Sequence, residues 1–103
     1  MIKFLLIGIL LLHTLFVNEY KPFIATAYSL KGRTASGEMV RTGIIAADPK
    51  VLKMHSKVNI KGLGDFVVKD TGGKIKGNKI DIWMPTRKQA IKFGVQKVIL
   101  KKL

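Results

Sequence analysis

The stretch Lys69–Met84, KDTGGKIKGNKIDIWM, joins a loop rich in glycine and lysine to a segment of alternating apolar residues. Over Ile80–Met84, a period of two places the two isoleucines on one face of a β-strand and Asp81 and Trp83 on the other. If the isoleucines face the core, Asp81 opens into a cleft with an indole beside it. The stretch therefore predicts a strand that carries a carboxylate next to an open loop.

Short apolar runs separated by Gly, Asn and Asp predict further strands on both sides of this one. A short helix is expected over Pro49–Met54, with Asp48 as its N-cap, and another between the capping box at Thr86 and the stop at Gly94. The expected strands are 23–28, 42–47, 57–61, 66–69, 80–84 and 95–100. This pattern predicts a mainly β fold, a small six-stranded closed barrel with one or two short helices.

The N-terminal residues have a different composition from the rest. A short positive start precedes the apolar run Phe4–Val17, which is shorter than the roughly 20 residues of a membrane span. A small-x-small cleavage site is not clear, because Ala25-Thr26-Ala27 falls within the first expected strand. We therefore expect residues 1–20 to be a signal peptide or an N-terminal membrane anchor. Residues 21–103 are then one exported domain, secreted or associated with the cell envelope. A buried core helix is the less favoured alternative.

The chain is strongly basic and has no cysteine. Residues 18–103 contain eighteen basic and six acidic side chains, a net charge of +12. That charge predicts an anionic partner, either nucleic acid, phospholipid headgroups or an acidic wall polymer, and export favours the last two. Two histidines without cysteine make a zinc site improbable, so neither a metal nor a cofactor is predicted.

Several familiar motifs are incomplete. Gly72 and Gly77 have the spacing of a phosphate-binding loop, but Asn78 stands where that loop needs a lysine. The Gly62-x-Gly64 pair has no third glycine and precedes a strand, unlike a dinucleotide-binding turn. Ser36 does not lie in a nucleophile elbow. The scarce carboxylates remain as the candidates for chemistry.

Each aspartate has a structural and a chemical interpretation. Asp81 is either a general acid, its pKa raised by apolar neighbours, or the ion-pair partner of a lysine in the adjacent loop. Asp70 ends a strand at a turn, where Asp commonly accepts bonds from the following N–H groups, and this does not exclude a catalytic role. Asp48 is most simply an N-cap. The glycines Gly72, Gly73 and Gly77 allow positive φ and close approach of the backbone to a ligand.

Four segments together resemble the three-aspartate, or 3D, domain family. They are TAY (Thr26–Tyr28), TASGEMVRTGIIAADP (Thr34–Pro49), VVKDTGGKIKGNKIDIWM (Val67–Met84) and FGVQKVIL (Phe93–Leu100). The family's namesake aspartates match Asp48, Asp70 and Asp81. The resemblance implies a double-psi β-barrel, similar to the catalytic domain of membrane-bound lytic transglycosylase A and to stationary-phase survival muralytic proteins.

The resemblance also implies a reaction and a site. Such enzymes cleave the MurNAc–GlcNAc bond of peptidoglycan without water, giving 1,6-anhydro-MurNAc ends. By position, Asp81 is then the acid and base, Asp70 orients or tunes it, and Asp48 supports the site. The expected substrate-binding residues are Thr34, Thr71, Gly72, Gly73, Lys74, Gly77 and Trp83. The expected protein is a monomer that binds glycan strands and not nucleic acid.

Two alternatives stay open, a non-catalytic polysaccharide-binding module and a hydrolytic muramidase. One departure from the family pattern concerns the turn after the first expected helix. There, His55 occupies a position where the family usually has glycine. We therefore expect an altered turn at one wall of the cleft.

Overall fold

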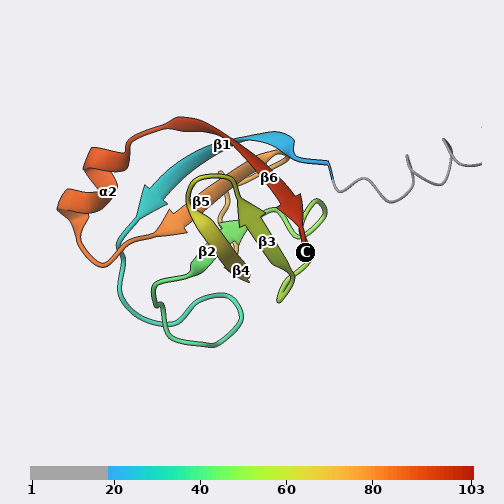
Figure 1. The fold of residues 1–103 in the computed structure, drawn as a ribbon. Coiled ribbons are helices and arrows are strands. Elements are labelled where there is room, and N and C mark those ends of the chain that lie inside the picture. Colours follow the sequence, from blue (N-terminus) through green and yellow to red (C-terminus); the bar gives the residue numbers. More distant parts are fainter. Residues whose placement is uncertain (1–18) are drawn as a thin grey trace, which may run out of the picture.

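The computed structural model describes residues 19–103, which form six strands and one short helix (Figure 1). The predicted leader falls almost entirely on residues 1–18, outside the described residues, so the boundary at residue 20 stays a prediction. The elements are β1 Lys21–Tyr28, β2 Ile44–Ala47, β3 Lys57–Ile60, β4 Gly64–Asp70, β5 Lys79–Trp83, α2 Arg87–Phe93 and β6 Gln96–Lys102.

The six strands close into a barrel in the order β1-β5-β2-β4-β3-β6. Two pairs are parallel, β1 with β5 and β2 with β4, and the other four are antiparallel. Closure matters for a domain this small, because a closed barrel leaves no unpaired strand edge. The predicted mainly β fold is confirmed in its strand number and its closure.

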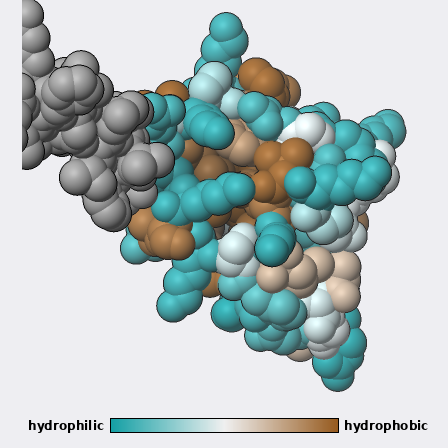
Figure 2. Space-filling view, turned by 90° about the vertical axis from the view of Figure 1, so that its right-hand side faces the viewer, coloured by the Kyte–Doolittle hydropathy of each residue, from teal (hydrophilic) through white to brown (hydrophobic). Residues whose placement is uncertain are grey.

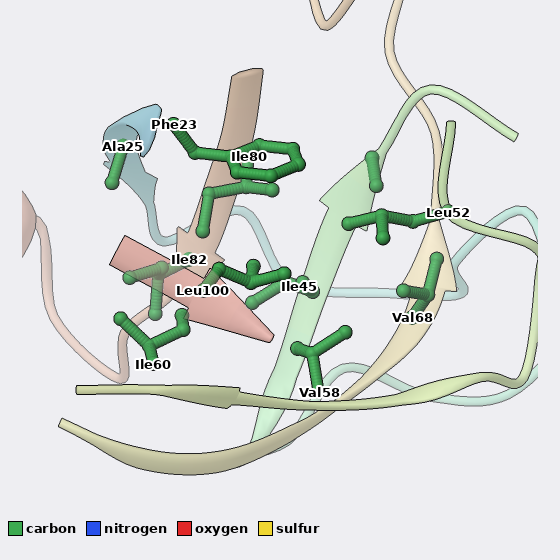
Figure 3. Close-up of a cluster of buried hydrophobic side chains, with 11 residues drawn as sticks. Phe23, Ala25, Ile45, Leu52, Val58, Ile60, Val68, Ile80, Ile82 and Leu100 are labelled. Atoms are coloured by element: carbon green, nitrogen blue, oxygen red, sulfur yellow. The ribbon is translucent and has the colours of Figure 1, made fainter. Parts of the chain in front are cut away.

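The barrel interior is filled by apolar side chains from every strand (Figure 3). Inward positions alternate along the strands, as period-two patterning requires. The core consists of Phe23, Ala25, Ile45, Ala47, Leu52, Val58, Ile60, Val68, Ile80, Ile82 and Leu100. Without a disulfide in the chain, this apolar cluster is the principal source of stability.

The alternation predicted for the 80–84 segment is confirmed. Ile80 and Ile82 of β5 are fully buried in the barrel core, and Met84 packs against it from beyond the strand end. Asp81 consequently points to the outside of the barrel. This is the face on which a site can form.

The helix predicted over Pro49–Met54 is wrong, because these residues form turns. The amides of Val51 and Leu52 both donate to the carbonyl of Asp48, at 2.9 Å, and no helix continues from there. Leu52 is drawn into the core, and the amide of His55 donates to the carbonyl of Val68 at 2.7 Å. Strand β3 begins at Lys57 and pairs with β4, so the chain must reach β4 within a few residues of Leu52. Tertiary hydrogen bonds therefore override the local helix signal.

The second predicted helix is confirmed as α2. Its N-cap is Thr86, whose side chain accepts a hydrogen bond from the amide of Gln89, and Gly94 ends it with a φ of 65°. Within residues 19–103, no helix is long and apolar enough to cross a membrane. Figure 2 shows one side of the domain, where apolar surface is interrupted by hydrophilic side chains.

Candidate active site

Four residues from adjacent strands form a row across the outside of the barrel. Asp81 of β5 pairs with Thr26 of β1 on one side and with Ala46 of β2 on the other. Ala46 pairs in turn with Asp70 of β4. Residues directly opposite each other in a sheet point to the same face, so both carboxylates emerge on one surface.

Ala46 separates the two carboxylates by one strand. Two strand spacings place the α-carbons of Asp70 and Asp81 about 10 Å apart. The neighbours of Ala46 in sequence, Ile45 and Ala47, both belong to the core, which confirms that Ala46 faces outward. Its methyl group is only 3 % exposed, so the surface between the two carboxylates is covered.

Asp81 is held at one oxygen and free at the other. Thr26 donates its hydroxyl to Oδ1 of Asp81 at 2.9 Å. Among the described residues, no hydrogen bond reaches Oδ2, and every buried side-chain polar atom there has a partner. Oδ2 must therefore be open to solvent. An anchored carboxyl with one exposed oxygen can deliver a proton to a bound ligand.

Burial raises the pKa of the Asp81 carboxyl above its ordinary value. The hydrogen bond from Thr26 and the charge of Lys79 oppose this rise, and the negative charge of Asp70 adds to it. The ion pairs of residues 19–103 all involve Glu38, so none neutralises Asp81. Among residues 19–103, Asp81 therefore forms no salt bridge with a loop lysine, which was the alternative interpretation.

Asp70 has a different environment, because both its oxygens are occupied. Oδ1 accepts from the amides of Ala35 and Thr71, each at 2.9 Å, and Oδ2 accepts from the hydroxyl of Tyr28 at 2.9 Å. The bond to the following residue is the turn chemistry predicted from the sequence. The other two bonds fix the 30–43 segment and β1 onto the end of β4.

Tyr28 joins the two sides of the row. Its side chain starts on β1 and reaches Asp70 on β4, with β5 and β2 lying between them in the sheet. Burial, the bond to Asp70 and the charges of Asp70 and Asp81 raise the pKa of the Tyr28 phenol. The phenol is consequently a permanent donor near neutral pH, directed at the carboxylate that it holds.

Asp48 ties two loops together. It is 8 % exposed, and its two oxygens accept from the amides of Lys50 and Gly77, at 3.0 and 2.9 Å. These backbone bonds lower the pKa of the Asp48 carboxyl. The first bond matches the expected capping role, although a turn and not a helix follows. The second bond attaches the 71–78 loop to the end of β2.

The glycines of the 71–78 loop serve different purposes. Gly77 has a φ of 65°, as the prediction of positive φ requires. Gly72 and Gly73 do not have positive φ, so that part of the prediction is wrong for them. A Cβ on Gly72 would lie 3.0 Å from Cγ1 of Ile75, whereas one on Gly73 would meet nothing within 4 Å. Close packing therefore explains Gly72.

The remaining predicted binding residues differ in exposure. Thr71 and Lys74 are exposed, and the amide of Thr71 donates to Asp70. Trp83 is only 8 % exposed, and its Nε1 donates to the carbonyl of Leu30 at 2.9 Å, so the open indole expected beside Asp81 is not present. Thr34 is 7 % exposed and uses its hydroxyl within its own turn, bonding the carbonyl of Glu38 at 3.0 Å.

A small hairpin around residues 33–39 forms one wall of the site. Arg33 and Met39 pair as an isolated antiparallel bridge, and the amide of Ser36 donates to the carbonyl of Lys69 at 3.0 Å. Glu38 forms an ion pair of 2.6 Å with Lys69. This wall carries Ala35, whose amide bonds Asp70, and so positions a backbone donor at the site.

Comparison with known proteins agrees with this architecture. The family model described as the 3D domain matches residues 43–103, which include β2 to β6 and all three of the aspartates discussed above. The chain belongs to the 3D domain family. In this 3D domain the three aspartates have three distinct environments, which the family pattern alone does not reveal.

Three relatives of the 3D domain come from Bacillus subtilis strain 168. The cell wall-binding protein YocH is 41 % identical over 88 residues, and YabE, provisionally named as a cell wall shaping protein, is 36 % identical over 83; each alignment covers 77 % of this chain. The prophage-derived uncharacterized protein YorM is 35 % identical over 95 residues, 84 % of this chain. The aligned regions span 31 %, 20 % and 40 % of these relatives' own lengths.

Sequence reasoning missed three residues of the site in this 3D domain. Thr26 and Tyr28 were quoted only as part of the family resemblance, and Ala46 was assigned only to a buried strand. The alternation of β1 could have placed Thr26 and Tyr28 on an outward face, opposite the buried Phe23 and Ala25. Nothing local in the sequence shows that this face lies beside Asp81, because the β1–β5 pairing joins distant segments.

Proposed function

We propose that this domain is a peptidoglycan lytic transglycosylase, with Asp81 as its acid and base. The observation that carries this proposal is the state of Asp81: one oxygen anchored by Thr26, the other open, and a pKa raised by burial. A carboxyl that keeps its proton at higher pH than usual, and presents it outward, suits protonation of a glycosidic oxygen.

The proposed reaction needs one carboxyl and no water. Asp81 protonates the oxygen that leaves with GlcNAc, and the bond from that oxygen to C1 of MurNAc breaks. The 6-hydroxyl of the same MurNAc attacks C1, and the Asp81 carboxylate takes the hydroxyl proton. The products are a free GlcNAc 4-hydroxyl and a 1,6-anhydro-MurNAc end, with the Asp81 proton restored.

The environment of Asp70 supports this single-carboxyl scheme. Ordinary glycosidases need a second carboxylate, as a nucleophile or as a base for water. Both oxygens of Asp70 are already taken by three donors from Tyr28, Ala35 and Thr71. We therefore assign Asp70 a positioning role, which fixes the wall of the site and adds negative charge near Asp81. We assign Asp48 an indirect role, because it holds the 71–78 loop through its bond to the amide of Gly77.

The setting supports a wall substrate. YocH is named for cell wall binding, and the net charge of +13 on this chain suits a matrix of anionic polymers. Thr71, whose amide bonds Asp70, and the exposed Gly73 and Lys74 that follow it in the chain are proposed to contact the glycan. Export by residues 1–20 remains part of this proposal, with residues 21–103 as the working domain.

The test is digestion of purified peptidoglycan by the full chain, as wild type and as Asp81→Asn. The control is Asp65→Asn, which changes an exposed carboxylate that accepts a bond from Asn59. Mass spectrometry of the released muropeptides should show anhydro ends for wild type and control, and none for Asp81→Asn. Fragments heavier by one water, with reducing MurNAc ends, would instead identify a hydrolytic muramidase.

A non-catalytic wall-binding module is the second candidate, favoured because the relative YocH is named as a cell wall-binding protein. Sedimentation with insoluble peptidoglycan separates the two functions. If Asp81→Asn sediments like wild type but releases nothing, Asp81 is catalytic. If neither protein releases muropeptides while both sediment with the wall, the domain is a binding module and the transglycosylase proposal fails.

A further inference from the structure

The barrel has a second face that lies opposite the candidate site. In the closed order β1-β5-β2-β4-β3-β6, strand β6 is three strands away from β2 in either direction. The site is centred on Ala46 of β2, so the outer face of β6 points the other way (Figure 1). We call this the β6 face and define it by Pro22, Ile24, Lys61, Leu63, Lys97, Ile99 and Lys101.

Lysines without acidic residues characterise the strands around β6. Strands β1, β3 and β6 contain five lysines, Lys21, Lys57, Lys97, Lys101 and Lys102, and neither Asp nor Glu. Strands β4 and β5 contain three of the six acidic residues of the chain, Asp65, Asp70 and Asp81. Strands β4 and β5 also contain Lys69 and Lys79, so their charges nearly cancel, whereas the strands around β6 contain only lysines among their charged residues.

The β6 face is also apolar, which distinguishes it from a plain basic patch. Pro22 pairs with Ile99 across β1 and β6, and Ile24 pairs with Lys97, so apolar and cationic side chains alternate on one surface. Ile24, Leu63 and Ile99 are 36 %, 45 % and 38 % exposed. Pro22, Leu63 and Ile99, with Lys61 and Lys97, line a groove of about 420 Å³ on this face.

An aromatic side chain borders this face where the described chain begins. The ring of Tyr20 lies below Lys101 and Lys61, with Nζ atoms 5.2 and 6.0 Å from its centroid, and its hydroxyl donates to Asn59 at 2.7 Å. Tyrosine and lysine beside exposed aliphatic residues are typical of surfaces that meet a bilayer at headgroup depth. In the sequence, only two residues separate Tyr20 from the apolar run Phe4–Val17.

We propose that the β6 face docks on the surface of an anionic phospholipid bilayer. The lysines would contact the headgroups, and Leu63 and Ile99 would enter the boundary between headgroups and acyl chains. A soluble polyanion, such as an acidic wall polymer, would use the lysines but would gain nothing from the exposed aliphatic residues. The apolar run that precedes Tyr20 in the sequence favours lipid for the same reason.

Docking on this face would orient the site. Because β6 and β2 lie on opposite sides of the barrel, a bilayer under β6 leaves Asp81 and Asp70 facing away from the membrane. This consequence rests on the proposed function, because the orientation matters only if the site acts on a wall glycan. Lipid binding itself does not depend on catalysis.

Vesicle sedimentation tests the docking with residues 19–103, which contain all six strands and the complete core cluster. Vesicles of phosphatidylcholine alone are compared with vesicles that contain phosphatidylglycerol. Lys97→Gln with Lys101→Gln should weaken binding to the anionic vesicles roughly 30-fold, given the usual gain per lysine at such a surface. Leu63→Ser with Ile99→Thr should weaken it severalfold at unchanged charge. The matched control is Lys50→Gln with Lys53→Gln, two exposed lysines outside the β6 face.

Each outcome decides the question. Selective losses in the two β6-face variants, with little change in the control, support the proposal. Equal losses in the control and in Lys97→Gln/Lys101→Gln would show that net charge alone is sensed, which overturns it. Unchanged binding of Leu63→Ser/Ile99→Thr would indicate a polyanion site and overturn the proposal. If wild type does not bind anionic vesicles, the β6 face is not a membrane-docking surface. Asp81→Asn should bind vesicles like wild type, so a failed transglycosylase assay leaves this result standing.

Discussion

Asp70 and Asp81 face the same side of the barrel and flank a single alanine. Ala46 pairs with Asp70 on its β4 side and with Asp81 on its β5 side. The two carboxylates nevertheless have different states, because Asp70 accepts three hydrogen bonds and Asp81 accepts one from another side chain. The two carboxylates therefore differ in their hydrogen bonding, and stability measurements can test the consequences of this difference.

Replacing Asp81 should stabilise the fold near neutral pH. Burial raises the pKa of Asp81 in the folded state, so ionisation costs folding free energy once the pH exceeds the unfolded value of about 3.9. Asp81→Asn removes this cost. We expect the urea midpoint of the variant to exceed that of wild type at pH 7, with the difference shrinking to nothing below about pH 4. A variant less stable than wild type at pH 7 would contradict the raised pKa.

The opposite sign is expected for Asp48. Two backbone N–H groups lower its pKa in the folded state, so its ionised form stabilises the fold above the unfolded value of about 3.9. Asp48→Asn should lower the urea midpoint at pH 7, because the amide nitrogen cannot accept the bond from Gly77 or Lys50. The loss should fade as the pH falls through the lowered pKa. Equal losses at pH 7 and pH 3 would point to packing instead.

The local part of the fold could be predicted from the sequence. Period-two alternation placed Ile80 and Ile82 inside and Asp81 outside, because a strand's two faces depend only on neighbouring residues. The helix expected after Asp48 failed for the converse reason. The capping residue is present, but the amide of His55 bonds Val68, a partner on a different strand. Local helix propensity is overridden where the backbone groups of the segment form hydrogen bonds with the barrel strands instead.

The site was predictable only in part. The spacing around Asp70 and Asp81 and the family resemblance selected two carboxylates that lie on one face of the barrel, but neither shows which donors surround them. The bond from Tyr28 to Asp70 spans 42 positions of sequence, and the indole of Trp83 is buried through a bond to Leu30, 53 positions away. Such contacts arise from strand order in the closed barrel, which one sequence does not specify.

Tyr28→Phe should weaken the fold and the proposed activity together. The substitution keeps the ring but removes the donor to Oδ2 of Asp70, leaving a partly buried carboxylate with two donors. Hydrogen bonds to charged groups contribute about 1.5–3 kcal/mol, so we expect a loss of about 2 kcal/mol in the free energy of unfolding, measured in urea. Tyr20→Phe is the matched control, because the Tyr20 hydroxyl bonds Asn59 of β3 and neither Asp70 nor Asp81. An equal loss of muropeptide release in the control would deny Tyr28 a positioning role.

Two adjacent glycines should respond differently to alanine. At Gly72 the new Cβ would lie 3.0 Å from Cγ1 of Ile75, which is only 7 % exposed, so the loop must shift. We expect Gly72→Ala to lower the free energy of unfolding by about 1 kcal/mol. Gly73→Ala meets nothing within 4 Å at a φ outside the positive range, and should be neutral or stabilise by about 0.4–1 kcal/mol. The melting temperatures of the two variants show whether close packing at residue 72 or the flexibility of glycine in the unfolded chain dominates the effect.

His55→Gly should stabilise the domain although it removes a contact. Among residues 19–103, His55 is the only residue other than glycine with positive φ, at 72°, and the left-handed region costs a side chain about 1–2 kcal/mol. Its ring contacts Nζ of Lys69 at 2.9 Å, but this contact is exposed and contributes little. Glycine relieves the backbone cost, offset in part by its greater freedom when unfolded, so we expect a gain of about 0.5–1 kcal/mol. His55→Ala loses the same contact yet keeps the cost, and it should be no more stable than wild type. If the glycine and alanine variants melt at the same temperature, the backbone conformation at residue 55 is not the cause.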